Sequence, residues 1–253
     1  MVLNRGELRI EPAAEILSAA RTWLDRVRPA LEPDFIAAYL TGSVLNQGFD
    51  IHQSRINVLV VSRSLGSTQF EALAKAIPAS VKSGPRFEPL FMSQSNIEKS
   101  LDSFPIEWLE IQERRLLLEG EDVVDRLQIS HTDLRLQCER ELRGKFIQLR
   151  QTYILHHAKP ADLDQALAAA ASGFAALFRT LLRLRGEIVP STAGQVIERV
   201  ADVFGLDAQG LLAAHLARYA GRKRSSEEAL GQYRVFLAEI ERLTAAIDQL
   251  RVP

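Results

Sequence analysis

Polar residues and a glycine–serine pair stand where predicted strands begin or end, and they are the positions most able to carry chemistry. They are Gly42, Ser43, Arg55, Asn57 and Glu88. The guanidinium of Arg55 stays protonated in proteins and can bind a carboxylate or a phosphate through parallel N–H donors. We therefore expect Arg55 either to pair with Glu88 across neighbouring strands or to bind a phosphate directly.

The first half of the chain mixes helical and extended patterns, as an α/β or α+β domain does. An amphipathic helix is predicted over residues 11–28, with a buried stripe made of Ile16, Ala20, Trp23, Leu24 and Val27. Strands are predicted over 35–40, 56–61 and 86–92, and either one or two further strands are predicted over 104–118. A helix over 68–77 is predicted to open with a Thr68–Glu71 capping box.

The second half carries almost no strand pattern. Amphipathic helices are predicted over 132–156, 162–185, 192–204, 207–219 and 226–250, and the last opens with a Ser225–Glu228 capping box. Helices joined by short loops predict a bundle. We place the domain boundary near residues 120–130, which gives an α/β domain over 1–125 and a helical bundle domain over 126–253.

The segment Tyr39-Leu-Thr-Gly-Ser43, the eleven-residue loop after it and the run Arg55-Ile-Asn57-Val-Leu-Val-Val61 resemble the signature of the nucleotidyltransferase superfamily, the polymerase beta-like fold. The resemblance implies an α+β fold, a nucleotidyltransferase-like mixed sheet flanked by helices and followed by an all-α helical bundle. In that family the Gly-Ser turn holds nucleotide phosphates, so the resemblance assigns this role to Gly42 and Ser43. Acids at the start of the next strand, with a third from a later strand, hold magnesium there.

The chain departs from that signature where the metal would bind. Arg55 and Asn57 stand at the positions of the paired acids, and Glu88 stands where the third would fall. Magnesium needs anionic oxygen ligands. A guanidinium about 4 Å from the ion would be repelled by about 4 kcal/mol per unit charge at an effective dielectric constant of 20. We therefore expect no metal ligands and no catalytic residues.

The preferred interpretation is a catalytically inactive nucleotidyltransferase-like protein that acts by binding. Its nucleotide-binding residues would be Gly42, Ser43, Arg55, Asn57 and Glu88, and its partner a nucleotide, another protein or a second copy of itself. One alternative is an active nucleotidyltransferase with magnesium on an unorthodox acid set, Asp50 and Glu88. Another is an interaction module of a toxin–antitoxin-like pair. No cofactor is expected unless the magnesium alternative holds.

Other candidate sites have simpler explanations. The Arg150–His156 segment resembles the motif of the HEPN ribonucleases, but basic residues at a helix C-terminus are also favoured by the helix dipole. The basic run over 222–224 has no interleaved aromatic residues, so nucleic-acid binding is not expected. Cys138 lies on the apolar stripe of its predicted helix and is expected to be buried and inert.

Composition describes an ordinary globular chain of 253 residues with a net charge of −1. A total this close to neutral gives no overall field for capturing nucleic acid or an acidic membrane. The single cysteine cannot form an internal disulfide, which suits a reducing compartment. The first residues lack the apolar run of a signal peptide and no apolar stretch is long enough for a membrane span, so we expect a cytoplasmic protein.

Overall fold

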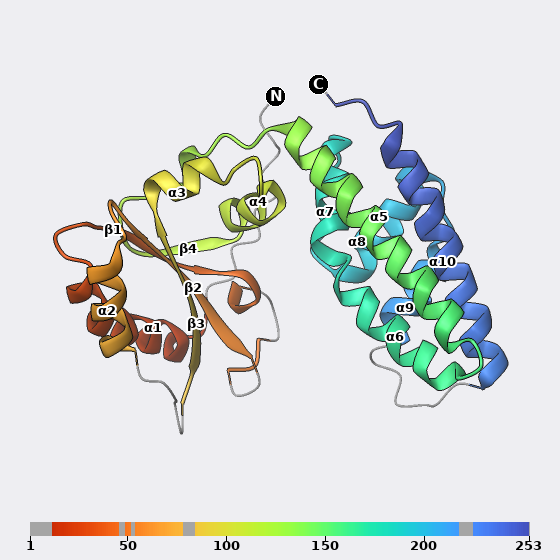
Figure 1. Cartoon of the computed structure of the whole chain (residues 1–253), viewed down its shortest axis with the longest axis horizontal. Coiled ribbons are helices and arrows are strands. Elements are labelled where there is room, and N and C mark those ends of the chain that lie inside the picture. Colours follow the sequence, from red (N-terminus) through yellow and green to blue (C-terminus); the bar gives the residue numbers. More distant parts are fainter. Residues whose placement is uncertain (1–11, 46–48, 52–53, 78–83, 218–224, 253) are drawn as a thin grey trace. The chain divides into compact units, whose positions relative to one another are not determined.

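The computed structural model describes residues 12–45, 49–51, 54–77, 84–217 and 225–252. Within them the chain divides into two compact units, one ending at Ile129 and the other beginning at Ser130. Figure 1 shows a sheet with helices in the first unit and only helices in the second. The α+β fold class and the mixed sheet followed by a helical region are thus confirmed.

The first unit is built on one four-stranded sheet with the order β3-β2-β1-β4. Its strands are β1 (Phe35–Thr41), β2 (Arg55–Ser62), β3 (Arg86–Ser93) and β4 (Arg115–Gly120). The central strand β1 is antiparallel to both of its neighbours, whereas β2 and β3 are parallel. The edge strand β3 contains Pro89, which pairs with Val58.

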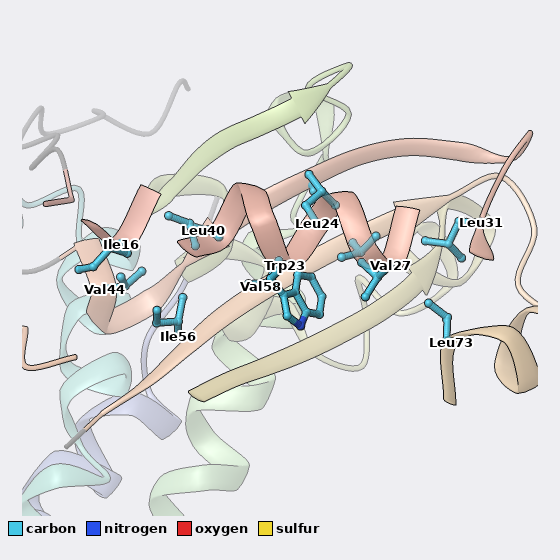
Figure 2. Close-up of a cluster of buried hydrophobic side chains, with 13 residues drawn as sticks. Ile16, Trp23, Leu24, Val27, Leu31, Leu40, Val44, Ile56, Val58 and Leu73 are labelled. Atoms are coloured by element: carbon cyan, nitrogen blue, oxygen red, sulfur yellow. The ribbon is translucent and has the colours of Figure 1, made fainter. Parts of the chain in front are cut away.

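One face of the sheet is covered by α1 (Ala14–Val27) and α2 (Ser67–Ala76). Figure 2 shows side chains of α1 directed onto the strands. All members of the predicted stripe on α1 are buried, which confirms that prediction: Ile16, Ala20, Trp23, Leu24 and Val27. Trp23 stacks on Phe87 of β3 with ring centroids 5.3 Å apart. The 3.6-residue period of α1 therefore builds this core.

The opposite face packs against α3 (Gln94–Lys99) and α4 (Pro105–Glu113), with Tyr39, Leu59 and Trp108 in its core. The prediction of strands throughout 104–118 is wrong, because residues 105–113 form α4 and only β4 is extended. Pro105 occupies the first turn of α4, where its missing N–H costs nothing. Ile106 and Leu109 are both buried at helical spacing.

Only helices form the described part of the second unit. They are α5 (His131–His156), α6 (Pro160–Ser172), α7 (Ala175–Leu184), α8 (Ala193–Phe204), α9 (Ala208–Ala217) and α10 (Ser226–Asp248). The single helix predicted over 162–185 is wrong, because the chain breaks at Gly173 and Phe174 between α6 and α7. Phe174 is buried there, 5.7 Å from Phe236 of α10 between ring centroids, so packing fixes the break.

The two predicted capping boxes have different outcomes. The Ser225 hydroxyl accepts a bond from the Glu228 N–H at 3.2 Å, and the Glu228 carboxylate accepts from the Ser225 N–H at 2.9 Å, which confirms that box. The Thr68 box is wrong, because α2 begins one residue earlier, at Ser67. Its N-cap is Gly66, whose N–H donates to Gln69 Oε1 at 3.0 Å.

Two further sequence expectations concern burial and membrane spans. Cys138 is fully buried in α5, and burial, with the nearby Glu141 charge, raises the pKa of its thiol to about 12. A thiol that stays protonated is a poor nucleophile.

Among the described helices, none taken singly has the length and apolar composition to cross a membrane. The segments Pro160–Ala170 and Ala175–Leu184 have the required length and apolar composition only when taken together, and a 50° bend separates them.

Candidate functional site

A row of residues runs across one end of the sheet. Thr41 at the end of β1 pairs with Asn57 on one side and with Arg115 on the other, and Asn57 pairs with Glu88. Side chains at paired positions point to the same face of a sheet, and so do residues two apart in a strand. Asn57, Glu88 and Arg55 therefore share the face that Tyr39 and Leu59 occupy further along β1 and β2.

Arg55 and Glu88 form an ion pair across the parallel strands β2 and β3. Arg55 Nη1 lies 3.2 Å from Glu88 Oε1, and the two side chains are 64% and 58% exposed. The pair expected from the sequence is thus present. Pairs this exposed contribute at most about 1 kcal/mol to stability, so the contact can be exchanged for another at little cost.

Gly42 brings the backbone close to the Asn57 side chain. Its φ of +74° lies in the left-handed region, and a Cβ at this position would stand 3.1 Å from Asn57 Nδ2. Glycine adopts this conformation without the steric cost that other residues have. Gly42 begins a short 3₁₀ segment, Gly42–Leu45, in which Ser43 is exposed and Val44 is buried.

Sequence reasoning missed Arg86, the first residue of β3. It pairs directly with Arg55 in the β2–β3 register and is exposed. Arg55, Arg86 and Glu88 together carry two positive charges and one negative, a local net charge of +1. Only the register of the structure reveals this pair, because it aligns the two arginines that begin β2 and β3.

The structure brings Gly42, Arg55, Asn57 and Glu88 to one end of the sheet, but the acid proposed as an alternative ligand lies in the preceding loop. Asp50 is exposed, and its backbone carbonyl accepts a bond from the Ser54 N–H at 2.9 Å.

The residues at the sheet end do not fit a magnesium site. Their one carboxylate, Glu88, is paired with a guanidinium, and Asn57 offers only a neutral amide. Magnesium binds hard anionic oxygens, and a neighbouring permanent cation disfavours it. In the part of the chain that the structure describes, no group of three or more His, Cys, Asp or Glu side chains could hold a metal ion.

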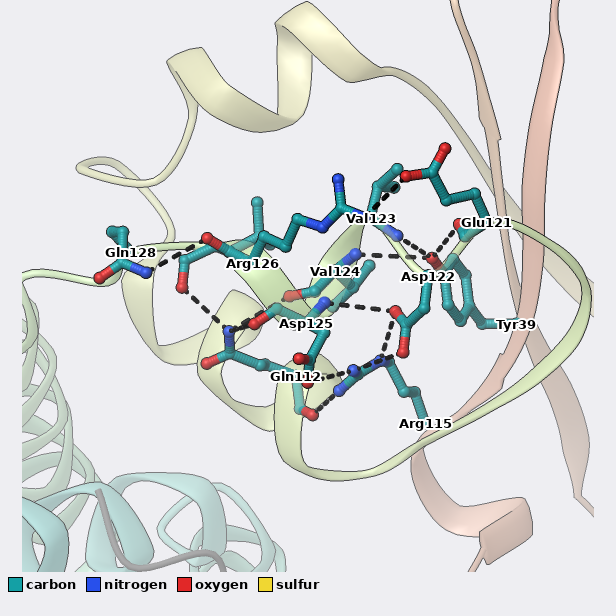
Figure 3. A network of polar contacts seen from close by, with 11 residues as sticks. Tyr39, Gln112, Arg115, Glu121, Asp122, Val123, Val124, Asp125, Arg126 and Gln128 are labelled. Carbon is teal, nitrogen blue, oxygen red and sulfur yellow. Dashed lines mark hydrogen bonds and ion pairs between the residues drawn. The ribbon is translucent and has the colours of Figure 1, made fainter. Parts of the chain in front are cut away.

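A second polar cluster lies at the other end of the sheet row, around Arg115 (Figure 3). The Arg115 guanidinium donates to Asp122 at 3.0 and 2.7 Å, to Asp125 at 2.9 Å and also to the Gln112 carbonyl. Burial opposes ionisation of Asp122, but Arg115 and the Asp125 N–H outweigh it and lower the Asp122 pKa. Arg115 is only 10% exposed, so the cluster holds the segment after β4 in place.

Tyr39 joins the same segment from the centre of the sheet. Its hydroxyl donates to the Glu121 carbonyl at 3.1 Å and accepts from the Val123 N–H at 2.9 Å. Burial raises the pKa of this hydroxyl from 10.0 to about 12. Tyr39 therefore ties β1 to the chain that leaves β4.

We expect Tyr39→Phe to destabilise the first unit by about 2 kcal/mol, because the Glu121 carbonyl and the Val123 N–H, whose bonds to Tyr39 are partly buried, each lose a partner. The raised pKa means that the neutral hydroxyl's contribution is complete below pH 10 and is lost as the pH rises towards 12. The variant should lack this loss. Urea unfolding at pH 8 measures the loss of stability in Tyr39→Phe, and unfolding at pH 11 measures the alkaline loss in the unchanged protein. If the unchanged protein and the variant lose equal stability between pH 8 and pH 11, the role given to the Tyr39 hydroxyl is contradicted.

The remaining sequence candidates have separate, ordinary partners. His156 Nδ1 lies 3.1 Å from Asp162 Oδ2, and the Arg150 guanidinium lies 5.5 Å from the centroid of the Phe146 ring. These contacts do not join Arg150 to His156. The basic run over 222–224 lies outside the described residues.

Comparison with known proteins gives a result only at the level of structure. No protein-family model and no curated protein sequence matches the chain. The structure is similar to the crystal structure of spectinomycin adenyltransferase AAD(9) from Enterococcus faecialis with ATP and spectinomycin. The TM-score is 0.52 at 15% sequence identity, over 87% of this chain and 99% of that one. The chain has the fold of the nucleotidyltransferase superfamily.

A second solved structure, a nucleotidyltransferase-like protein from Exiguobacterium sibiricum, matches with a TM-score of 0.40 at 16% identity. The match covers 91% of this chain and 74% of that one. The nucleotidyltransferase fold expected from the Gly-Ser signature is thus confirmed by AAD(9). In this chain Gly42 and Ser43 directly follow β1, while β2 begins with Arg55 and has Asn57 as its third residue.

Proposed function

We propose that this protein binds a nucleotide on a nucleotidyltransferase-like scaffold and does not transfer it. The observation that carries the proposal is the Arg55–Glu88 ion pair at the sheet end. Where the superfamily signature has paired acids, this chain has a cation and an amide. An arginine at this place favours an anionic ligand and opposes a divalent cation.

A nucleotide is the ligand class that the fold and the residues support together. The AAD(9) structure, which shares the fold, was determined with ATP. In this chain the Asn57 amide lies beside Gly42, and Arg55 is bound to Glu88, the residue that pairs with Asn57 on β3, so neutral and charged hydrogen-bond donors lie at the same end of the sheet. Charge-assisted bonds from arginine to phosphate are among the stronger ones that proteins make.

Calorimetric titration with ATP and with GTP tests the binding. We expect a dissociation constant below the millimolar range and a loss of about tenfold in affinity for Arg55→Ala, as for one charge-assisted hydrogen bond. Arg63→Ala is the matched control, because Arg63 is an exposed arginine just beyond the other end of β2. No heat and no thermal shift at millimolar nucleotide would overturn the proposal.

A transfer assay separates binding from catalysis. The protein is incubated with α-labelled ATP or GTP and with Mg²⁺ or Mn²⁺, with spectinomycin as a test acceptor because the AAD(9) crystal contains it. We expect no labelled product and no release of pyrophosphate. Product formation that Glu88→Ala abolishes would instead support the active enzyme with an unorthodox acid set.

A further inference from the structure

We propose that Arg55 and Arg86 together replace the metal, so that the site binds the phosphates of a magnesium-free nucleotide and Glu88 is the carboxylate that those phosphates displace. This inference rests on the proposed function and names how its site recognises the ligand. It follows from the β2–β3 register, which sequence reasoning did not have.

The register makes the two arginines neighbours. Arg55 pairs with Arg86 across parallel strands, and such strands lie about 4.8 Å apart. Each guanidinium is therefore within reach of the same group of phosphate oxygens. Arg55 uses one of its terminal nitrogens on Glu88, and both arginines are exposed, so a ligand can approach them from solvent.

Glu88 competes with the ligand for Arg55. Its carboxylate holds Arg55 Nη1 at 3.2 Å in an exposed pair. Exposed pairs are weak, and a polyphosphate carries more negative charge than one carboxylate. A monoanion gains little by exchanging with Glu88, whereas a polyphosphate reaches Arg55 and Arg86 at once. The site therefore selects for multiple negative charges.

Magnesium weakens this interaction instead of supporting it. In a metal-dependent site the ion bridges the protein's acids and the phosphates. Here the protein supplies cations, and a magnesium ion bound to the phosphates neutralises the charge that the arginines recognise. The nucleotide–magnesium complex is therefore the poorer ligand.

The test is titration of the full chain with ATP in EDTA and again with Mg²⁺ in excess. We expect affinity at least about threefold higher in EDTA, and a loss of about tenfold in EDTA for Arg86→Ala. Arg63→Ala, at the far end of β2, should leave the affinity unchanged. Inorganic tripolyphosphate should compete with ATP, because the phosphates carry the recognition.

Glu88→Gln gives the decisive contrast. It keeps the size of the side chain and removes the competing charge, so we expect ATP affinity in EDTA to rise severalfold. A fall in affinity, or ATP binding that requires Mg²⁺, overturns this inference and leaves nucleotide binding itself intact. If neither ATP nor GTP binds with or without metal, the proposed function fails as well. Because these positions are exposed, unchanged thermal unfolding verifies that each variant is folded.

Discussion

Gly120→Ala is expected to destabilise the first unit by about 4 kcal/mol, the largest effect of any single change considered. Gly120 ends β4 with φ +93°, and an added Cβ would stand 2.0 Å from the Ile36 carbonyl oxygen and 2.8 Å from Ala37 Cα. Both obstacles are backbone atoms, so no side-chain rotation relieves the clash. The Ile36 carbonyl is held at this place because it accepts a bond from the Glu121 N–H at 3.1 Å, next to the Ala37–Gly120 pair of β1 and β4.

Urea unfolding followed by tryptophan fluorescence measures this effect in the right place. Both tryptophans, Trp23 and Trp108, belong to the first unit, so the signal reports that unit. Gly66→Ala is the control, because a Cβ there meets only the Gln69 side-chain oxygen at 3.5 Å. We expect about 0.5 kcal/mol for the control. If both variants unfold at the same urea concentration, the close approach of β1 and β4 is not as described.

Arg115→Ala is expected to cost the first unit about 3 kcal/mol, because the change leaves two acids and a carbonyl without their cation. Arg115 is 10% exposed and donates to Asp122, Asp125 and the Gln112 carbonyl. Asp122 is the more buried of the two acids, with 35% of its side chain exposed. Burial alone would raise the pKa of Asp122, but the hydrogen bond and the charge of Arg115 outweigh burial and lower it, so the carboxylate stays ionised.

Arg126→Ala is the matched control, an arginine in the same segment. It pairs with Glu121 at 2.8 Å, but the two side chains are 74% and 61% exposed, so we expect a change of about 0.5 kcal/mol or less. The double variant of Arg115 and Asp122 to alanine should cost less than the sum of the single changes, since the two side chains share one interaction. Equal urea midpoints for Arg115→Ala and Arg126→Ala would contradict the structural role of Arg115.

The sequence pattern predicted the elements that bury a regular face, such as α1 and β2, because their period is set by burial. It failed where two periods compete. In the segment around Trp108, Ile106 is followed by apolar residues both two and three positions further on, which fits a strand and a helix alike. Only Pro105 indicated that a helix begins there. The Ala-rich segment before Phe174 continues a helical pattern through a break that tertiary packing imposes.

The part of the candidate site that could be predicted consists of residues on strands that follow one another in the chain. Arg55 and Glu88 lie on successive parallel strands, so their ion pair could be anticipated. Arg86 could not, because its meeting with Arg55 depends on the exact register of β2 and β3. The Arg115 cluster was not predicted for a related reason. The Arg115 side chain binds Asp122 and Asp125 in the irregular segment after β4, and the sequence pattern does not predict the path of such a segment.

The proline in β3 has a consequence for how this protein behaves at high concentration. A strand at the border of a sheet is a template on which another chain can extend the sheet into an aggregate. Pro89 has no N–H to offer such a chain, and the charged Arg86 and Glu88 lie within three residues of it. Addition of a fifth strand at this border is therefore disfavoured, and the arginines beside it stay accessible from solvent.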